Sequence, residues 1–437
     1  MNTNIKDYGA KADSAFLNTE AIQKAIDACT ESGGGRVTVP SGEYVIGTLR
    51  LKSNVELHLE QGAVLVASSC LEDYNETKEY PQNYDAPREK WSGKHLIIAV
   101  EQKNVAITGQ GKIVGPADAF FGGKMKYAGN FGWRYGFYET DDSIPMRPGQ
   151  LICFVECEGV TVRDVTLTKS TCWTLLLYGC DFAQVSGVKI FNSNQHANTD
   201  GIDIDTCSYV TVSDCIIKTG DDAITFRSCA NRLVNEEKRK SKECKYIAVT
   251  NCVLSSSCHA FRIGVGEGTI RNISISNIVI KEACTAFQFT PAWGGQGNVR
   301  FKDISVSNVT AEDVGSPMSI FTGQGHCMER VSFSDFQCGT KGSLRVNATP
   351  GTIRDLTFHN LAVYDLEAEK ILPQHWVRDR GEWLFEAQGV DRLTLDNVRV
   401  YARDEYFEDR KEFCNFANTT FIKKDITVIH KEEIKSL

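Results

Sequence analysis

The sequence predicts an all-β fold: a single-stranded, right-handed parallel β-helix, a solenoid of stacked coils, with a short N-terminal capping helix. Three observations predict it. A short motif of apolar, any and apolar residues recurs along most of the chain, and the stretches between its copies are rich in Gly, Asn, Ser and Asp. No amphipathic pattern of period 3.6 follows the opening segment. Strands this short cannot bury a core alone, so successive coils must stack.

The N-terminal residues 1–40 are expected to cap this solenoid. The pair Asn18–Thr19 precedes residues 20–29, whose apolar side chains recur at helical spacing, and Gly33–Gly34–Gly35 follows as an end signal. One short helix is therefore predicted here, before the β-rich pattern begins.

The repeated motif sets the length of the coils. Its copies begin at Val105, Val160, Val185, Val210, Ile247, Ile273, Ile304, Val331, Leu356 and Leu393. From Val160 the steps are 25, 25, 37, 26, 31, 27, 25 and 37 residues, which indicates a period near 25 with insertions. We expect one β-helix domain over residues 1–437, with an aromatic loop insertion at 116–149 and a charged one at 228–245.

Composition narrows the class of protein. Lys and Arg number 48 and Asp and Glu 56, so the net charge is 48 − 56 = −8, and 42% of the residues are hydrophobic. This is a globular composition, and its acidity disfavours nucleic-acid or anionic-membrane partners. No apolar run approaches the ~20 residues that span a bilayer.

Cysteine usage and the first residues bear on the compartment. The 16 cysteines include no paired CxxC motifs, so a zinc site is not expected, and most fall at apolar positions. Buried thiols are predicted, with disulfides as the alternative. The opening MNTNIKDYGA has no basic or apolar leader, which favours the cytoplasm, or a secreted or periplasmic location if the natural protein starts earlier.

Two acidic motifs carry the chemistry. Residues 198–205 read NTDGIDID and residues 220–224 read GDDAI, so Asp200 and Asp221 lie 21 residues apart, close to one coil. Residues one coil apart stack at roughly 4.8 Å, which would place Asp200 beneath Asp221 and Asp222. Crowded carboxylates do not all ionise, so one can act as an acid and the others as bases, as glycosidic hydrolysis requires. A calcium site and a purely structural turn are the alternatives.

These motifs resemble a known family. Asn-Thr-Asp-Gly at 198–201, Gly-Asp-Asp at 220–222 and the later His259 are similar to the motifs of the polygalacturonases, glycoside hydrolase family 28. Residues 4–13, 33–40 and 53–59 resemble its N-terminal cap and first coil. The resemblance implies a right-handed β-helix, a pectic oligosaccharide or polysaccharide substrate and hydrolysis with inversion. No cofactor and no metal are expected.

The resemblance also implies roles for individual residues. Asp221 corresponds to the general acid, Asp200 and Asp222 to the pair that activates water, and His259 to a residue that supports protonation of the acid. Asn198 and Asp203 are candidate substrate-binding residues. A one-coil step by itself suggests the short carboxyl separation of retaining enzymes, so inversion rests on the resemblance.

The chain departs from the family downstream. Where polygalacturonases carry an Arg-Ile-Lys motif that holds a uronate, residues 286–290 read AFQFT, without a cation. The leaving-group site would then take a neutral sugar such as rhamnose, stacked on Phe287, Phe289 or Trp293. Core packing is the alternative for the two phenylalanines, because alternating strand residues share a face.

Three other features are candidates for substrate contacts. Arg262 could hold a uronate carboxylate or pair with a nearby acid such as Glu267. Trp173 lies in the coil before Asp200, where the family often has a tryptophan near its cleft. The aromatic insertion, with Trp133 and Arg134, could wall one end of the cleft.

The sequence therefore favours a glycoside hydrolase that releases galacturonic acid from the non-reducing ends of pectin-type oligosaccharides, rhamnogalacturonan fragments included, in pectin and cell-wall breakdown. A β-helical polysaccharide lyase and a non-enzymatic glycan-binding β-helix are the alternatives. A lyase would need a basic cluster, and a glycan-binding β-helix would be favoured by trimer-forming repeats and a long terminal interaction module. Neither is evident in the sequence. The oligomeric state stays open.

Overall fold

The computed structural model describes residues 1–121, 146–229, 243–290, 299–323, 325–365, 383–402 and 413–430. These residues divide into two compact units, each taken by itself below. Unit 1 holds the described residues up to Asp221, and unit 2 holds those from Asp222 onward.

Unit 1 is built from short parallel strands. Its elements are β1 (Asn2–Asn4), η1 (Ile5–Tyr8, a 3-10 helix), α1 (Thr19–Glu31), β2 (Gly35–Val39), β3 (Gly42–Ile46), β4 (Leu49–Arg50), β5 (Val55–Leu59), β6 (Ala63–Ala67), the 3-10 helices η2 (Leu71–Asp73) and η3 (Pro87–Glu89), β7 (Ile97–Val100), β8 (Lys103–Gly109), β9 (Lys112–Val114), α2 (Ala117–Phe121), β10 (Ile152–Val155), β11 (Glu158–Arg163), β12 (Thr166–Thr168), β13 (Leu175–Tyr178), β14 (Asp181–Ser186), β15 (Lys189–Phe191), β16 (Ile202–Asp205), β17 (Ser208–Ser213) and β18 (Ile216–Thr219).

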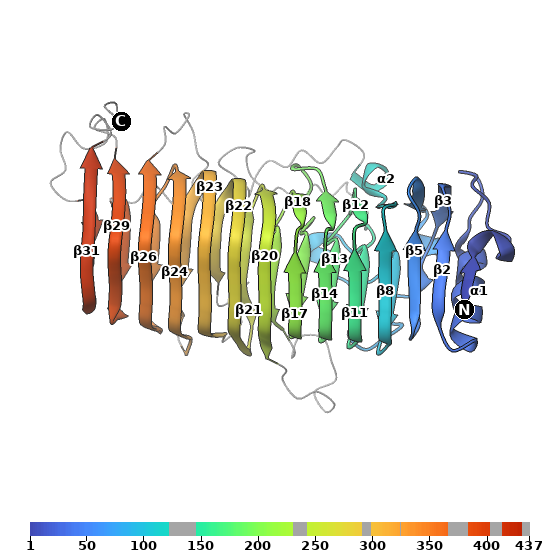
Figure 1. The fold of residues 1–437 in the computed structure, drawn as a ribbon, viewed down its shortest axis with the longest axis horizontal. Coiled ribbons are helices and arrows are strands. Elements are labelled where there is room, and N and C mark those ends of the chain that lie inside the picture. The colour runs from blue at the N-terminus through green and yellow to red at the C-terminus, as the bar shows by residue number, and fades with distance from the viewer. Residues whose placement is uncertain are drawn as a thin grey trace. The chain divides into compact units, whose positions relative to one another are not determined.

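Each strand of unit 1 pairs in parallel with a strand from the next coil. One column runs β5, β8, β11, β14 and β17, as the neighbouring arrows in Figure 1 show. A second column runs β6, β9, β12, β15 and β18, and a third runs β7, β10, β13 and β16. Coils of three short strands are the geometry of a β-helix, as the repeat predicts.

The predicted N-terminal helix is confirmed as α1. Its apolar face, formed by Ala21, Ile22, Ala25, Ile26 and Cys29, is buried. The helix ends where the N–H of Gly34 donates to the carbonyl of Cys29 at 2.9 Å, with Gly34 in the left-handed region at φ 108°. This helix covers an edge that would otherwise expose core residues.

The coil lengths in unit 1 differ from the sequence interpretation. Val160 pairs with Ala183 and Ala183 with Val210, so the two steps are 183 − 160 = 23 and 210 − 183 = 27 residues. The predicted steps of 25 and 25 through Val185 are wrong. Val185 instead pairs with Val162. The first step is two residues shorter than predicted and the second is two residues longer, so their sum is unchanged.

Unit 2 is built from longer strands that continue through the corners of the coils. Its elements are β19 (Ile224–Ser228), β20 (Cys244–Ser256), β21 (His259–Gly266), β22 (Thr269–Thr290), β23 (Arg300–Phe321), β24 (Cys327–Thr340), β25 (Leu344–Asn347), β26 (Thr352–Asp365), β27 (Phe385–Gln388), β28 (Val390–Asp391), β29 (Leu393–Ala402), β30 (Cys414–Asn415) and β31 (Phe421–His430).

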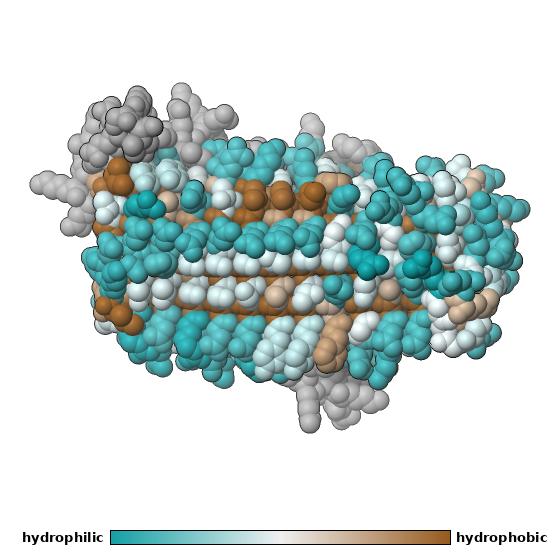
Figure 2. Space-filling view, viewed as in Figure 1, coloured by the Kyte–Doolittle hydropathy of each residue, from teal (hydrophilic) through white to brown (hydrophobic). Residues whose placement is uncertain are grey.

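Like residues stack on like residues in unit 2. The row Ile273, Ile304, Val331 and Leu356 lies inside the coils, and the neighbouring positions Ser274, Ser305, Ser332 and Thr357 form a polar row. Figure 2 shows such rows as bands of similar hydropathy that cross the strands of this unit. In this part of the chain the steps of the repeat are as predicted, from Ile273 through Leu393.

The corners of the coils explain the recurring asparagines. Asn251, Asn277 and Asn308 have φ between 51° and 57°, a left-handed conformation that asparagine tolerates. Their side chains form a ladder, with Asn277 donating to Asn251 at 3.2 Å and Asn308 to Asn277 at 2.8 Å. The ladder links successive coils at the point where the chain must turn.

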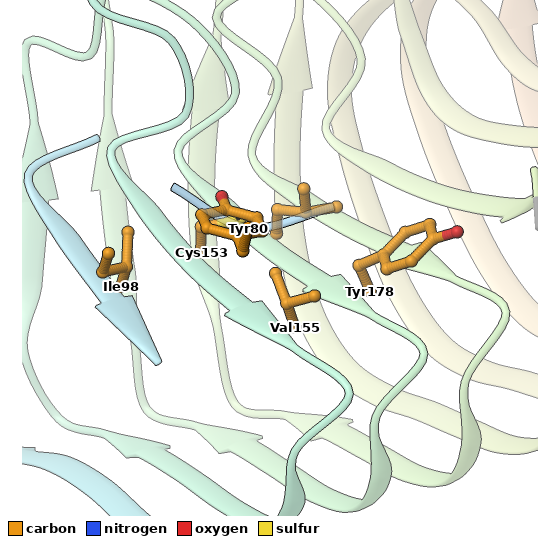
Figure 3. Close-up of a cluster of buried hydrophobic side chains, with 6 residues drawn as sticks. Tyr80, Ile98, Cys153, Val155 and Tyr178 are labelled. Carbon is orange, nitrogen blue, oxygen red and sulfur yellow. The ribbon is translucent and has the colours of Figure 1, made fainter. Parts of the chain in front are cut away.

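An apolar ledge covers part of the outer face of unit 1. Outward positions of β7, β10 and β13 carry Ile98, Cys153 and Leu176, and Tyr80 packs over them, with its hydroxyl 3.7 Å from the Cys153 sulfur (Figure 3). Tyr80 lies in the segment 74–95, which runs between β6 and β7. We call the cluster formed by Ile98, Cys153, Val155, Leu176 and Tyr178 the ledge, and Tyr80 covers it.

The cysteines and the helices bear on two further expectations. All sixteen cysteines are free thiols, and most of them are buried, as predicted. No helix among the described residues is both long and apolar enough to cross a membrane. The central parts of both predicted loop insertions, 122–145 and 230–242, lie outside the described residues.

Candidate active site

The first acidic motif forms the turn that leads into β16 in unit 1. The carbonyl of Asp200 accepts a hydrogen bond from the N–H of Thr174, on the preceding coil, at 2.9 Å. The hydroxyl of Thr199 donates to the carbonyl of His196 at 2.7 Å and accepts from the N–H of Gly220 at 3.2 Å. The turn is therefore fixed to the coil before it and to the second acidic motif.

Asp221 lies beside Asp200, within unit 1. One carboxylate oxygen of Asp221 lies within 4.8 Å of one of Asp200. Asp200 is only 2% exposed and Asp221 only 8%. Oδ2 of Asp221 accepts a hydrogen bond from the backbone N–H of Asn198 at 3.0 Å. The expectation that one coil of spacing brings these two acids together is confirmed. Two buried carboxylates this close disfavour simultaneous ionisation, so one of them readily holds a proton.

Asp222 is the next residue and belongs to unit 2. Its Oδ2 accepts a hydrogen bond from Nε of Arg262, and its Oδ1 accepts one from the backbone N–H of His259 at 3.2 Å. Burial raises the pKa of the Asp222 carboxyl, but the charge of Arg262, together with His259 and the Cys258 thiol, outweighs burial and the pKa is lowered overall. Asp222 is therefore ionised at neutral pH.

The imidazole of His259 is buried beside this carboxylate. Burial lowers the pKa of His259 to about 3, even though the charge of Asp222 acts in the opposite direction. Its Nδ1 is buried and has no hydrogen-bond partner in the described part of the chain. The ring is neutral at neutral pH, and its role in supporting the acid stays a prediction.

Arg262 pairs with an acid, as one of its two interpretations expected, and that acid is Asp222. Arg262 is 6% exposed and lies on the outward row of β21, opposite Thr225 on β19 and Gln288 on β22. It is therefore first of all the counter-ion of Asp222.

Phe287 is part of the core. Its ring is fully buried and stacks on Phe261 at a centroid separation of 4.9 Å, with Phe333 and Phe336 packed edge-on. The expectation that Phe287 stacks on a sugar is wrong, because strand alternation turns its side chain inward. Phe289 is buried in the same way. Trp293 lies outside the described residues, as do Trp133 and Arg134.

Three other candidates lie in unit 1. Trp173 is partly buried, with its ring centroid 6.0 Å from that of Trp91, and it directly precedes Thr174, the partner of Asp200. Asp203 is fully buried in β16, in register with Leu176 of the ledge. The side-chain oxygen of Asn198 accepts a hydrogen bond from Arg147 at 2.7 Å. Substrate contact by these three residues stays a prediction.

One group in unit 2 has the donors for a soft metal ion. Single donor atoms of Asp222, Cys258 and His259 lie within 4.8 Å of one another. The guanidinium of Arg262 already neutralises Asp222, however, and would repel a cation there. The donor set therefore fits a metal poorly, and the chemistry below uses none.

Sequence reasoning missed three residues. Arg147 left no signal, since it is a single arginine far along the chain from the acids. Cys258 directly precedes His259 in the sequence, but nothing there indicated that its thiol would act on Asp222. Arg227 also acts on Asp222 and shares the outward face of β19 with Thr225. Its place five residues after Asp222, on an alternating strand, could have indicated it.

Together these features define a class of protein. A parallel β-helix with an acid pair that can hold a proton, and an ionised carboxylate that can take one, has the groups that hydrolysis of a glycosidic bond requires. The model of glycosyl hydrolases family 28 matches residues 29–345. The chain belongs to that family.

Known relatives agree with this placement. A probable polygalacturonase of Vitis vinifera is 29% identical over 237 residues, 52% of this chain and 44% of the relative. An exo-poly-alpha-D-galacturonosidase of Dickeya chrysanthemi is 28% identical over 257 residues, 51% of this chain and 41% of the relative. The match therefore spans less than half the length of these relatives.

The solved structure of a family 28 exopolygalacturonase from Yersinia enterocolitica has the same fold. It matches with a TM-score of 0.66 at 16% identity, covering 98% of this chain and 78% of that one. The predicted fold class, a right-handed parallel β-helix, is confirmed.

Proposed function

We propose that this chain removes α-linked galacturonic acid from the ends of pectin-type oligosaccharides by hydrolysis. Asp221 is the general acid that protonates the leaving oxygen, and Asp222 and Asp200 hold and deprotonate the attacking water. The observation that carries this proposal is the difference between the two environments. The carboxyl group of Asp221 lies beside the carboxyl group of Asp200, whereas the positive charge of Arg262 keeps the carboxyl group of Asp222 ionised.

The division of labour follows from the charges. A carboxyl beside another carboxyl retains a proton more readily, which suits an acid. A carboxylate held ionised by a guanidinium accepts a proton from water, which suits a base. The polygalacturonase and galacturonosidase names of the relatives support the same reaction class.

Charge at the site supports a uronic acid as the sugar that is released. Arg262 and Arg227 both lie on outward positions near Asp222 and both act on its carboxyl. An arginine suits a uronate carboxylate, which it can bind with two parallel hydrogen bonds. The next outward positions in register are Gln288 and Ser319, which are neutral, and this supports a neutral sugar such as rhamnose on the leaving side.

The ledge supports action at chain ends. Four outward side chains stack in register on successive coils of unit 1: Ile98, Cys153, Leu176 and Asp203. Tyr80 covers the three apolar ones, and the fourth is acidic. A sugar chain cannot lie on the covered positions, because Tyr80 occupies that face. The groove would then begin at β16 and hold one terminal sugar on that side.

Digestion of defined oligosaccharides tests the proposal. Substrates with galacturonate at the non-reducing end, joined to galacturonate or to rhamnose, should release free galacturonate without new ultraviolet absorbance. Absorbance from a new C=C bond would indicate a lyase, and no product from any uronate substrate would refute the proposal. D221N should be inactive and folded, and a wild-type rate for this variant would refute the assignment of the acid.

The anomer of the first product tests the stereochemistry. Inverting enzymes usually separate their two carboxyl groups by ~6.5–9.5 Å and retaining enzymes by ~5–5.5 Å. Oxygens of Asp200 and Asp221 lie within 4.8 Å, so their closeness gives no support to inversion with Asp200 as the sole base. Proton NMR during the first turnovers should show β-galacturonate if the reaction inverts.

A further inference from the structure

Arg147 is a fully buried arginine of unit 1. Its Nε donates to the carbonyl of Thr171 at 2.6 Å, and its Nη1 donates to the carbonyls of Glu89 and Lys90 at 2.6 and 3.0 Å. Its Nη2 donates to the side-chain oxygen of Asn198 at 2.7 Å. One guanidinium therefore joins three segments that lie far apart in the sequence.

The contact with Asn198 connects Arg147 to Asp221, the proposed general acid. Asn198 has a left-handed backbone at φ 53°, and in this conformation its N–H donates to Oδ2 of Asp221 at 3.0 Å. Asparagine tolerates this conformation, so the backbone alone does not fix where the Asn198 N–H points or hold it against the acid. The hydrogen bond from Arg147 supplies support directly beside the acid.

The charges of Arg147 and Asp200 both act on one neighbouring thiol, that of Cys172. Burial raises the pKa of the Cys172 thiol, the charge of Arg147 lowers it, and that of Asp200 raises it. The guanidinium also lies over the ring of Phe121, 5.2 Å from its centroid. The planar guanidinium group thus has hydrogen-bond acceptors around its edges and an aromatic ring against one face.

An arginine is required for this arrangement. Its donors diverge in one plane and reach acceptors on opposite sides at the same time. A lysine keeps the charge, but its single ammonium cannot span from Thr171 to Asn198. An Arg-to-Lys change is therefore a test of geometry with charge held constant.

We propose that Arg147 is a positioning residue that holds the acid Asp221 in place through Asn198. It does not touch the sugar. It fixes the turn whose backbone N–H binds one oxygen of Asp221, so that the other oxygen presents the proton to the leaving group. Because it also binds segment 74–95 at Glu89 and Lys90, it ties the cover over the ledge to the acid. This inference rests on the proposed function, since it assigns a role in that reaction.

The test compares R147K and N198G with the wild type on the same galacturonoside. N198G keeps the left-handed backbone and the N–H but removes the oxygen that Arg147 binds. Both variants should lower kcat by about 100-fold with little change in KM, as expected for misplacement of a catalytic group by about 1 Å. The double variant should be no slower than the slower single variant, because both changes break one link.

The pH profile separates positioning from a purely structural role. The N–H of Asn198 favours the ionised form of Asp221, so loosening it should move the alkaline limb of the kcat/KM profile to higher pH. R36K is the matched control, because Arg36 pairs with Glu56 on the surface of the same unit at 2.9 Å. It should keep the wild-type profile.

The outcomes are distinct. An inactive wild type refutes the proposed function. An active wild type with R147K and N198G at wild-type rates, or slow with an unmoved alkaline limb, refutes the positioning role. A crystal structure of R147K gives a readout that does not depend on activity. An Asn198 N to Asp221 Oδ2 distance still near 3.0 Å would overturn the inference, and a longer one would support it.

Discussion

Replacing Arg262 with glutamine should destabilise the protein and shift its pH profile. Arg262 is 6% exposed and Asp222 is 2% exposed. If one partner is removed, water therefore cannot solvate the charge of the other. Two unit charges about 4 Å apart attract by about 4 kcal/mol at an effective dielectric constant of 20. Removing one partner from a buried pair typically costs about 3–5 kcal/mol. We therefore expect R262Q to lose about 3–5 kcal/mol in free energy of unfolding at pH 7.

The sign of the pH effect follows from the lowered pKa of Asp222. A carboxyl whose pKa is lowered in the folded chain stabilises that chain above the unfolded value near 3.9, and the contribution is lost as pH falls through the folded value. The deficit of R262Q should thus be largest above pH 4 and shrink in stronger acid. Without Arg262, burial raises the pKa of Asp222, so the acidic limb of the kcat/KM profile should move to higher pH.

Urea unfolding at pH 7 and pH 3 measures the deficit. R36Q is the control, because the Arg36 and Glu56 side chains are 44% and 25% exposed and such a pair contributes about 0–1 kcal/mol. A double-mutant cycle with D222N should give a coupling of several kcal/mol. A loss in R262Q as small as that in R36Q, or a coupling near zero, would refute the reasoning.

Three other predictions follow from burial. F287A should lose about 3–5 kcal/mol in urea unfolding, because the ring fills the core, and a loss below 1 kcal/mol would contradict that placement. His95 and His259 have pKa values lowered to about 4 and about 3, so unfolding below pH 6.5 takes up protons. Stability should fall by about 1.4 kcal/mol per pH unit for each histidine between pH 6.5 and 4, and H95Q should flatten the slope of unfolding free energy against pH. Y80A should uncover the ledge and allow cleavage within chains; product sizes measured over time would show only terminal release if the ledge has no such role.

Much of the fold was readable from the sequence, because the pattern that specifies it is local. Strands such as the one beginning at Ile273 alternate apolar and polar residues, and stacking repeats that alternation from coil to coil. The same regularity placed Asp200 beside Asp221. Where turns vary in length the regularity fails, which is why Val160 pairs with Ala183 and not with Val185.

Side-chain direction was harder to predict than spacing. Phe287 and Gln288 are neighbours in the sequence, yet one faces the core and the other lies in the outward row with Arg262. The motif at 286–290 showed that a cation was missing without showing which of its side chains face outward. The register of β21 against β22 decided it.

The sequence by itself determined the coil architecture, the class of reaction and the acids, since each depends on residue types at short or regular spacing. Only the tertiary structure decided which charges meet. Arg262 reaches Asp222 across 40 residues, and Arg147 reaches Asn198 across 51. Coils of unequal length bring such residues together, and a one-dimensional pattern carries no record of which side chains then share a buried space. The different surroundings of Asp221 and Asp222, on which their proposed roles as acid and base rest, arise from that packing.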